Sequence, residues 1–363
     1  MIRTYAFPNI DRVVHGPGAV ARVPKLVDEL TAKRVMIVTG RTLATQTPLI
    51  DALTSALGER HVATYAAMRA HAPRADIEEA LEIASGHGVD LFVGYGGSSV
   101  TDATKIVALR LAELRGDTRV PQIHVPTTLS SGEWTPAAGM TGDVAGVKTY
   151  VSDPRMAPFA IVLDPEVTLA TPDELWLSTG MKIVDHACEM LWGPRAHPFT
   201  DTLAQEALRR VRRSLPRTHA DRDALEPRLD CQLAGWMSMA GIVNVRVHLS
   251  HTLGHQIAAR WDVGHGVTSG ITLPPVLRYM ASENPDGVRR VGEAFEVDTV
   301  DGAALAIADL VAALGLPSTL RAVGARRDDF PAVAEATIAA GRATGYVPTG
   351  GSDALVALLD EMW

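Results

Sequence analysis

The order in which strand-like and helix-like segments follow one another is the feature that most restricts the fold of this chain. Short apolar runs typical of buried strands, at 34–39, 61–65, 91–95 and 122–125, alternate with segments whose apolar residues recur at helical spacing. Such alternation favours a parallel sheet covered by helices on both faces. From Pro172 onward nearly every segment has helical spacing. The sequence therefore predicts an α/β N-terminal domain with a parallel sheet, followed by an all-α C-terminal domain.

Chain length and the change of pattern together define the expected domains. A chain of 363 residues is too long to fold around one ordinary hydrophobic core. The alternation of strand-like and helix-like segments ends near Asp164-Pro165. We therefore predict an α/β domain over residues 1–165 and an all-helical domain over residues 166–363. The helices expected in the second domain span 173–190, 200–215, 229–247, 251–259, 274–281, 288–294, 303–314 and 353–362. A further strand is expected at 12–15.

Charge and hydropathy exclude two classes of partner. The formal net charge is −8, and no run of Lys or Arg longer than two offsets it, so nucleic acid is not expected as a partner. No stretch of eighteen apolar residues occurs, and the N-terminus lacks a basic segment followed by an apolar run. We therefore expect a cytoplasmic protein with no membrane partner.

Four of the twelve histidines lie between residues 248 and 266: His248, His251, His255 and His265. His251 and His255 are four residues apart, so on a helix they would share one face. Imidazole both transfers protons near neutral pH and binds metal ions, so converging histidines allow either kind of site. The sequence predicts that the helical domain carries the chemistry.

Two polar loops follow predicted strands of the first domain and suit a ligand that carries phosphate. The first, Gly96-Gly97-Ser98-Ser99, opens a helix, and the second, at 127–132, is rich in hydroxyl groups. Glycine lets a ligand approach the backbone, and the amides at a helix N-terminus attract anions. Because polar loops at neighbouring strand ends suit a dinucleotide, we predict a Rossmann-like domain that binds NAD(H) or NADP(H). The candidate cofactor-binding residues are Gly96, Gly97, Ser98, Ser99, Asp102, Thr127, Thr128 and Ser131.

The end of the first central strand bears on the choice between the two nicotinamide cofactors. A carboxylate is expected there if the cofactor is strictly NAD, because it would bind the ribose 2′-hydroxyl. The sequence has Gly40 and Arg41 instead. These residues leave room and positive charge for a 2′-phosphate, so we predict that NADPH is accepted, alone or alongside NADH.

Taken together, the motifs resemble those of the iron-containing, or group III, alcohol dehydrogenase family, which has a dehydroquinate synthase-like fold. The stretch 96–102 resembles the family's Gly-Gly-Gly-Ser-x-x-Asp loop, with Ser98 in place of the third glycine, and 125–128 resembles its second cofactor loop. The resemblance places Lys148 at the nicotinamide ribose and His255 beside the nicotinamide. It aligns 180–189 with the helix that bears the family's first two metal ligands. If a metal is bound, the resemblance implies that its ligands are His186, His251 and His265.

One substitution separates this chain from the metal-binding pattern. Lys182 stands where the family has a metal-binding aspartate, four residues before His186 and so on the same helical face. An ammonium about 4 Å from a divalent ion would be repelled by roughly 8 kcal/mol at an effective dielectric constant of ~20, so we expect no catalytic metal. Asp185 is one residue out of phase and is expected to point about 100° away, in a structural role. The substitution, with 131–136 and 151–154, makes the chain similar to the maleylacetate reductase branch, which works without a bound metal.

We therefore predict an NAD(P)H-dependent reductase of a small, anionic oxo acid or enone acid. Lys182 would take over the charge of the metal by binding the substrate's carbonyl oxygen or a carboxylate. The candidate catalytic residues are Lys182, His186, His251, His255 and His265, with His255 as the proton donor.

Other possibilities stay open from sequence. One is a metal-dependent group III alcohol dehydrogenase. Another, from a different class, is a lyase or cyclase that retains its nicotinamide with no net redox change. In any of these cases an exposed strand edge near residues 3–14 could pair across a two-fold axis, and we expect a homodimer.

Overall fold

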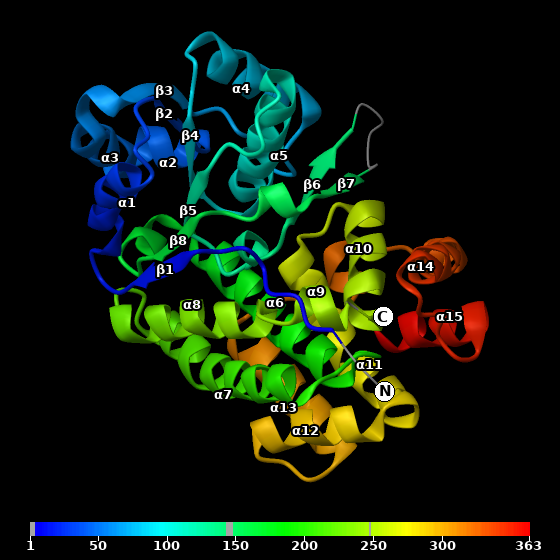
Figure 1. Cartoon of the computed structure of the whole chain (residues 1–363). Coiled ribbons are helices and arrows are strands. Elements are labelled where there is room, and N and C mark those ends of the chain that lie inside the picture. The colour runs from blue at the N-terminus through cyan, green and yellow to red at the C-terminus, as the bar shows by residue number, and fades with distance from the viewer. Residues whose placement is uncertain (1–3, 143–147, 247) are drawn as a thin grey trace. The chain divides into compact units, whose positions relative to one another are not determined.

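The computed structural model of the chain describes residues 4–142, 148–246 and 248–363, and it divides into two compact units (Figure 1). Phe7–Pro172 forms an α/β unit, and Asp173–Trp363, with the described residues before Phe7, forms a helical unit. The predicted fold class is confirmed, because a parallel sheet with flanking helices precedes an all-helical region.

The division between the units falls after Pro172, later than the expected boundary at 165. The turn η5 (Val167–Ala170) stays with the sheet, and the Thr171 hydroxyl next to it donates to the Thr127 carbonyl at 2.8 Å. At the other end, the Tyr5 hydroxyl donates to the Ala240 carbonyl at 2.8 Å, which ties this residue to the helical unit. Hydrogen bonds at both ends thus assign these short segments differently from the sequence prediction.

Six parallel strands form the sheet of the α/β unit. Their order across the sheet is β1 (Arg12–His15), β8 (Ala160–Leu163), β5 (Gln122–Pro126), β4 (Leu91–Gly96), β2 (Val35–Val38) and β3 (His61–Tyr65). In the register of the central strands, Val93 lies opposite Ile37 on one side and Ile123 on the other. Because the strands are parallel, the loops that follow β2, β4 and β5 leave the same edge of the sheet.

Alternate residues of β2 enter two separate cores, as expected of a strand buried on both faces. Met36 and Val38 pack with residues of α4 (Arg74–Gly86) and α5 (Ser98–Arg115). Val35 and Ile37 pack with residues of α1 (Val23–Glu29) and α3 (Leu49–Leu57). The short helix α2 (Arg41–Gln46) follows β2 directly. Helices therefore cover both faces of the sheet, which is what the alternation of segments predicted.

A two-stranded antiparallel hairpin, β6 (Ala137–Thr141) and β7 (Lys148–Ser152), accompanies the main sheet and was not predicted. Its strands contain Gly139, Thr141 and Lys148 and lack a run of apolar residues. The hairpin is tied to α5, because the Gly139 amide donates to Asp102 at 3.1 Å. Its position is therefore set by tertiary contacts that local sequence does not reveal.

The helical unit is built around α6 (Asp173–Trp192), which is buried without interruption from Trp176 to Trp192. The other helices are α7 (Pro198–Ala220), α8 (Leu225–Met239), α9 (Ile242–Val245), α10 (Leu249–Trp261), α11 (His265–Glu283), α12 (Pro285–Phe295), α13 (Val300–Ala313), α14 (Phe330–Thr344) and α15 (Gly351–Glu361). Among these, α7, α8, α10, α11 and α12 pack against α6. Side chains projecting from α6 therefore enter the interior of the unit.

One expected helix, at 229–247, is divided in the structure into α8 and α9, and its last residue lies outside the described residues. The break falls at Ala240 and Gly241. A Cβ added at Gly241 would lie 2.0 Å from Cγ2 of Thr200 on α7. Glycine fits at this break because the backbone approaches Thr200 too closely for a side chain.

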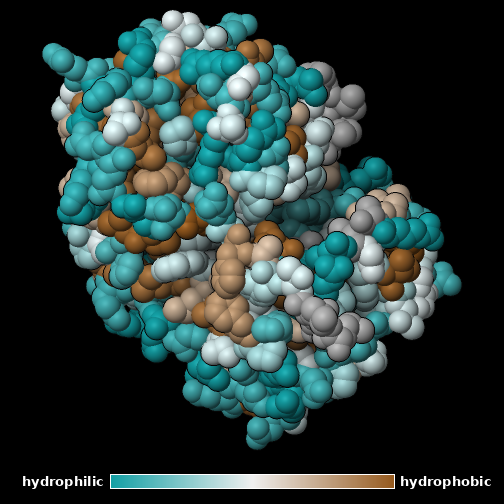
Figure 2. Space-filling model, viewed as in Figure 1, coloured by the Kyte–Doolittle hydropathy of each residue, from teal (hydrophilic) through white to brown (hydrophobic). Residues whose placement is uncertain are grey.

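Hydrophilic residues predominate on much of the face in Figure 2, and the hydrophobic residues on it form separate groups. Exposed large hydrophobic side chains include Leu114, Leu175 and Leu305. Among the described residues, no helix has both the length and the apolar character needed to cross a membrane.

Candidate active site

The two polar loops predicted to bind a dinucleotide lie side by side in the α/β unit. Gly96 ends β4 opposite Pro126 at the end of β5, and the Thr127 amide donates to the Gly96 carbonyl at 3.0 Å. Gly40 follows β2, which is the other neighbour of β4. Three strand ends therefore present Gly40, Gly97 and Thr127 along one edge of the sheet. This is the place where dinucleotides bind in sheets of this kind.

Gly97 is the point where the first polar loop comes close to the second, at Thr128. It caps α5, and a Cβ at this position would lie 3.0 Å from Cγ2 of Thr128. The amides of Ser98 and Ser99 begin the helix, where no preceding turn supplies carbonyl partners and the helix dipole favours an anion. The loop thus suits the phosphate of a dinucleotide, and a side chain at residue 97 would crowd Thr128 in the second loop.

Several polar side chains predicted to bind the cofactor also hold the loops in shape. The Ser99 hydroxyl accepts from the His71 amide at 2.9 Å, and the Ser131 hydroxyl donates to the Leu129 carbonyl at 3.1 Å. The hydroxyls of Thr128 and Ser130 are hydrogen-bonded at 3.0 Å. Cofactor binding by these side chains and by Asp102 stays a prediction.

Two further residues predicted to bind the cofactor, Arg41 and Lys148, lie on elements other than the two polar loops. Arg41 is exposed at the start of α2, beside Gly40. Lys148 begins β7, but its side chain lies outside the described part of the structure.

A buried ion, which sequence reasoning did not single out, fixes the second loop. The Lys105 ammonium donates to the carbonyls of Gly132, Thr135 and Ala137 at 2.5, 2.7 and 3.0 Å. Burial lowers the pKa of Lys105 to about 8, and burial raises the pKa of nearby Glu133 to about 7. The one available signal was the lysine on an otherwise apolar face of α5. The three hydrogen bonds to backbone carbonyls make Lys105 a structural cation beneath the loop.

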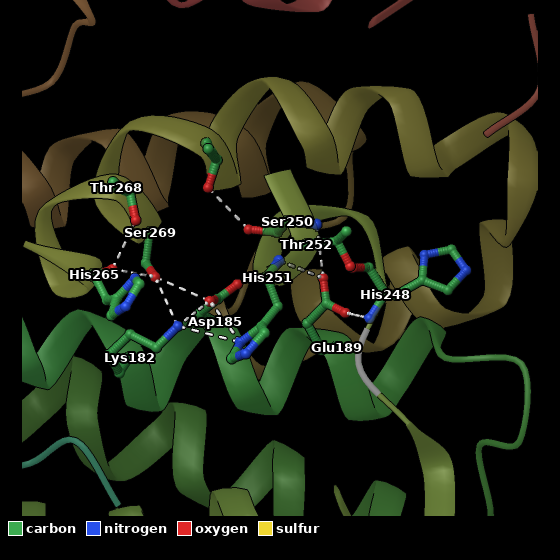
Figure 3. Close-up of polar contacts among 11 residues, drawn as sticks. Lys182, Asp185, Glu189, His248, Ser250, His251, Thr252, His265, Thr268 and Ser269 are labelled. Atoms are coloured by element: carbon green, nitrogen blue, oxygen red, sulfur yellow. Dashed lines mark hydrogen bonds and ion pairs between the residues drawn. The ribbon is translucent and has the colours of Figure 1, made fainter. Parts of the chain in front are cut away.

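In the helical unit, four of the predicted histidines converge with Lys182 (Figure 3 labels His251, His265 and Lys182). The ring centroids of His251 and His255 on α10 are 4.3 Å apart, and those of His255 and His265, the first residue of α11, are 4.7 Å apart. The His186 ring of α6 lies 5.5 Å from that of His251. Three helices therefore bring these imidazoles into one cluster, as their spacing suggested.

Asp185 belongs to this cluster, and the expectation that it points away was wrong. Its Oδ2 lies 2.7 Å from Lys182 Nζ, accepts from the Ser269 hydroxyl at 2.9 Å, and is 3.7 Å from His251 Nδ1. The lysine side chain is long enough to lie along α6 and reach the carboxylate of the residue three positions later. Figure 3 shows both side chains directed at the same point. The ammonium is thus paired, and both partners are buried.

Burial and the charge of Lys182 together keep two imidazoles of the cluster, those of His186 and His251, neutral. Burial lowers the pKa of His186 and of His251, and the charge of Lys182 lowers both further. Burial alone would raise the pKa of Asp185, but Lys182 and then His251 hold that pKa well below its usual value. We conclude that the cluster holds one ion pair beside the neutral rings of His186 and His251.

His248, the fourth histidine of the sequence motif, does not join the cluster. Its ring lies on that of Tyr346, with centroids 3.5 Å apart, and Figure 3 shows it on the far side of Glu189 from Lys182. Its backbone amide donates to the buried carboxylate of Glu189, as do those of Ser250 at 2.9 Å and His251 at 3.4 Å. Glu189, which sequence reasoning missed, therefore caps α10 from α6.

Two family models match the chain over most of its length. The model described as iron-containing alcohol dehydrogenase matches residues 10–165, and the model described as Fe-containing alcohol dehydrogenase family, C-terminal, matches residues 176–363. The chain belongs to the iron-containing alcohol dehydrogenase family. This membership confirms the resemblance stated from sequence and covers both units.

Individual relatives within the family agree with this assignment. A maleylacetate reductase of Pseudomonas aeruginosa is 30% identical over 324 residues, which are 89% of this chain and 88% of the relative. The crystal structure of maleylacetate reductase from Rhizobium sp. strain MTP-10005 covers 100% of this chain and 99% of its own, with a TM-score of 0.88 and 26% identity. A 1,3-propanediol oxidoreductase structure, with a TM-score of 0.91 but 23% identity, shows the shared fold. The chain is an NAD(P)-dependent oxidoreductase of this family.

The family's name implies iron, but the residues at this place do not fit a divalent ion. Lys182 Nζ lies 3.3 Å from His251 Nδ1, so the ammonium contacts one of the rings that would have to bind the metal. The described residues contain no group of three or more His, Cys, Asp or Glu arranged to hold a metal ion. Repulsion of roughly 8 kcal/mol between an ammonium and a divalent ion about 4 Å away, at a dielectric constant of ~20, opposes binding.

Proposed function

We propose that this protein is an NAD(P)H-dependent reductase of a small oxo acid or enone acid, of the kind that maleylacetate represents, and that it works without a divalent metal. The observation that carries the proposal is the buried Lys182 ammonium among the imidazoles, where the family has an acidic metal ligand. The relatives named maleylacetate reductase support the substrate class.

The side chains of the cluster supply what a metal would otherwise supply. The loops that follow β2, β4 and β5 would hold the reduced nicotinamide cofactor, which would supply the hydride for the electrophilic carbon of the substrate. A unit positive charge about 4 Å from the carbonyl oxygen stabilises the developing negative charge by roughly 4 kcal/mol at a dielectric constant of ~20. Lys182 contributes to that charge from its contact with His251, and Asp185 offsets part of it. His255, whose ring lies near those of His251 and His265, is the proposed proton donor to the product.

Three further expectations are part of the proposal. Gly40 and Arg41 at the end of β2 support acceptance of NADPH alongside NADH. The Lys182 ammonium supports an anionic substrate, although its pairing with Asp185 makes the cluster less positive than an unpaired lysine would. The homodimer and the cytoplasmic location expected from the sequence stay predictions.

A steady-state screen with both nicotinamides tests the proposal. Maleylacetate, 2-oxo acids, 3-oxo acids and simple aldehydes are compared by the loss of reduced-nicotinamide absorbance, before and after chelator treatment. We expect the highest kcat/KM with an oxo acid or enone acid and no loss of activity on chelation. One tightly held metal per chain whose removal abolishes activity would instead establish the metal-dependent alcohol dehydrogenase. Turnover with no net change in nicotinamide would indicate a lyase or cyclase.

A further inference from the structure

The contacts of the Lys182 ammonium account for all of its hydrogen-bonding capacity. Its Nζ lies 2.7 Å from Asp185 Oδ2, 3.3 Å from Ser269 Oγ and 3.3 Å from His251 Nδ1. A lysine ammonium has three N–H donors and no lone pair. Each donor therefore already has a protein acceptor, and the side chain is only 8% exposed. This arrangement leaves no N–H of Lys182 directed at a substrate.

The contact with His251 also fixes which nitrogen of that ring carries the proton. Since the ammonium can only donate, His251 Nδ1 must be the nitrogen with the lone pair. The alternative, an Nδ1–H donating to Asp185, would span 3.7 Å, which is beyond hydrogen-bond distance. Neutral His251 then carries its proton on Nε2, at the other side of the ring.

We propose that Lys182 acts on the reaction through His251: the ammonium holds the imidazole in the Nε2–H tautomer, and Asp185 and Ser269 hold the ammonium in place. Lys182 and Asp185 are positioning residues in this scheme. His251 is the group that presents an N–H to the carbonyl oxygen as negative charge develops there. The assignment deepens the proposed function and rests on it for the identity of the reacting oxygen, but the tautomer itself requires no substrate.

Nitrogen NMR of the full chain with ring-labelled histidine tests the tautomer directly. Its imidazole correlations distinguish the two protonation sites, and the His251→Gln variant assigns the His251 signals. We expect the Nε2–H form in the native protein. In Lys182→Met, Asp185 becomes the only charged neighbour of Nδ1, so we expect a switch to the Nδ1–H form. Arg210→Met, which removes a cation paired with Asp230 in the same unit, is the matched control and should leave the signals unchanged.

Kinetics provide a second measurement, made with whichever carbonyl substrate the native enzyme reduces. Lys182→Met should lower kcat by about 100-fold or more, as expected for an imidazole held in the wrong tautomer. In the His251→Gln background the same change should have less than about a twofold effect, because its target is absent. If Lys182→Met does not fold, Lys182→Gln replaces it in both measurements.

The outcomes separate this inference from the proposed function. An Nδ1–H signal in the native protein, or an undiminished effect of the Lys182 change without His251, would overturn the role given to Lys182. Failure to reduce any oxo acid would overturn the proposed substrate class and leave the tautomer result standing.

Discussion

Lys182 and Asp185 form a buried ion pair, so the positive charge of the lysine is largely neutralised close to its source. Their side chains are 8% and 1% exposed, and the distance between Lys182 Nζ and Asp185 Oδ2 is 2.7 Å. A substrate bound here therefore meets an ion pair and the neutral rings of His186 and His251 rather than an isolated cation. Selectivity for an anion must come from geometry and from the direction of this dipole more than from net charge.

Removing one partner of this pair should cost much more stability than removing both. Lys182→Met leaves the Asp185 carboxylate buried without its cation, and we expect a loss of about 3–5 kcal/mol in the free energy of unfolding. Lys182→Met combined with Asp185→Leu removes the stranded charge and should recover most of that loss. Urea denaturation of the two variants measures the difference. Arg210→Met should cost less than about 1 kcal/mol, because Asp230 keeps Arg213 as a partner; equal losses in all three variants would contradict the pairing.

A second residue-scale prediction concerns the cofactor. Arg41→Ala should lower kcat/KM for NADPH by about tenfold, the loss of a partly screened contact with phosphate worth ~1.4 kcal/mol. The value for NADH should change by less than about twofold. Arg22→Ala, which alters another exposed arginine of the same unit, is the control. A native preference for NADH above about a hundredfold, or an equal effect on both cofactors, would refute the role of Arg41.

Sequence could identify Lys182 as the decisive substitution, but it could not identify its partner. The angular position of Asp185 on α6 describes where its Cα–Cβ bond points, about 100° from His186. It does not describe where a four-carbon side chain three residues earlier will reach. Ser269 was also missed, because its contact with Asp185 depends on how α11 packs against α6. Side-chain partners across helices are fixed by packing, which single-sequence patterns do not contain.

At the scale of elements, the helix α10 depends on a cap that comes from another helix. Glu189 of α6 accepts backbone amides of His248, Ser250 and His251. Glu189→Ala would leave buried donors unsatisfied, so we expect a loss of about 3 kcal/mol in stability and a lower kcat, because α10 carries His251 and His255. Glu189→Gln keeps one oxygen acceptor, so its stability and kcat should lie between those of Glu189→Ala and those of the native enzyme.

The control for this prediction is a cap elsewhere in the helical unit. Thr299 caps α13 by accepting from the Gly302 amide at 3.0 Å. Thr299→Ala should cost about 1 kcal/mol and leave kcat unchanged. If Glu189→Ala loses stability by urea denaturation with no change in kcat, the cap supports the fold without positioning the histidines.

The segment η3 (Gly132–Trp134) contains a buried acid whose titration should affect stability. Burial raises the pKa of Glu133 to about 7 from its ordinary value of 4.5. Between these pH values the unfolded chain releases the proton while the folded chain keeps it, so stability falls as pH rises through this window. The contribution is about 3 kcal/mol. Burial also raises the pKa of Glu189, to about 8, so stability should fall over the same window for a second reason. Glu133→Gln should therefore remove only the Glu133 part of the decrease, about 3 kcal/mol, in urea denaturation series, whereas Glu78→Gln on the exposed side of α4 should leave the whole decrease unchanged.

Elements with strong local patterns could be predicted from sequence, and those fixed by distant contacts could not. Strands β1 and β3 and helices α6 and α13 lie close to where apolar spacing placed them. The hairpin β6–β7 and the helix α14 were missed. Alternating small and polar residues in the hairpin, and the many alanines of α14, give weak periodicity. Their positions depend on partners such as Asp102, which lies 37 residues from Gly139 in the chain.

At the scale of the whole molecule, the order of elements determined the fold class and left the boundary uncertain. Alternation followed by helices was enough to predict a parallel sheet and a helical unit. The segment that contains Thr171 has no regular periodicity. Its hydrogen bond to the Thr127 carbonyl and the packing of Val167 among residues of the sheet show that it stays with the sheet. Unit boundaries follow tertiary hydrogen bonds, which a change of pattern approximates to within several residues.

The predicted homodimer can be tested at the edge strand β1, which pairs with β8 on one side of the sheet. The amides of Arg12 and Gly16 donate toward β8, so by the alternation of a strand the Val14 amide does the same and the Val13 amide faces the opposite side. Val13→Pro therefore removes a donor only from the outer edge. If dimers form by pairing of this edge, light scattering should give a native mass near twice 38.7 kDa and a monomer mass for Val13→Pro.

Val14→Pro is the matched change on the inner side of the same strand. It removes a hydrogen bond to β8 and should lower the free energy of unfolding by about 1–3 kcal/mol. It leaves the backbone donor on the outer edge of β1 in place. A native monomer would show that the homodimer prediction is wrong. A Val13→Pro variant that remains dimeric, with native stability, would place the interface elsewhere, because proline at this position leaves the β8 ladder intact while blocking any partner strand.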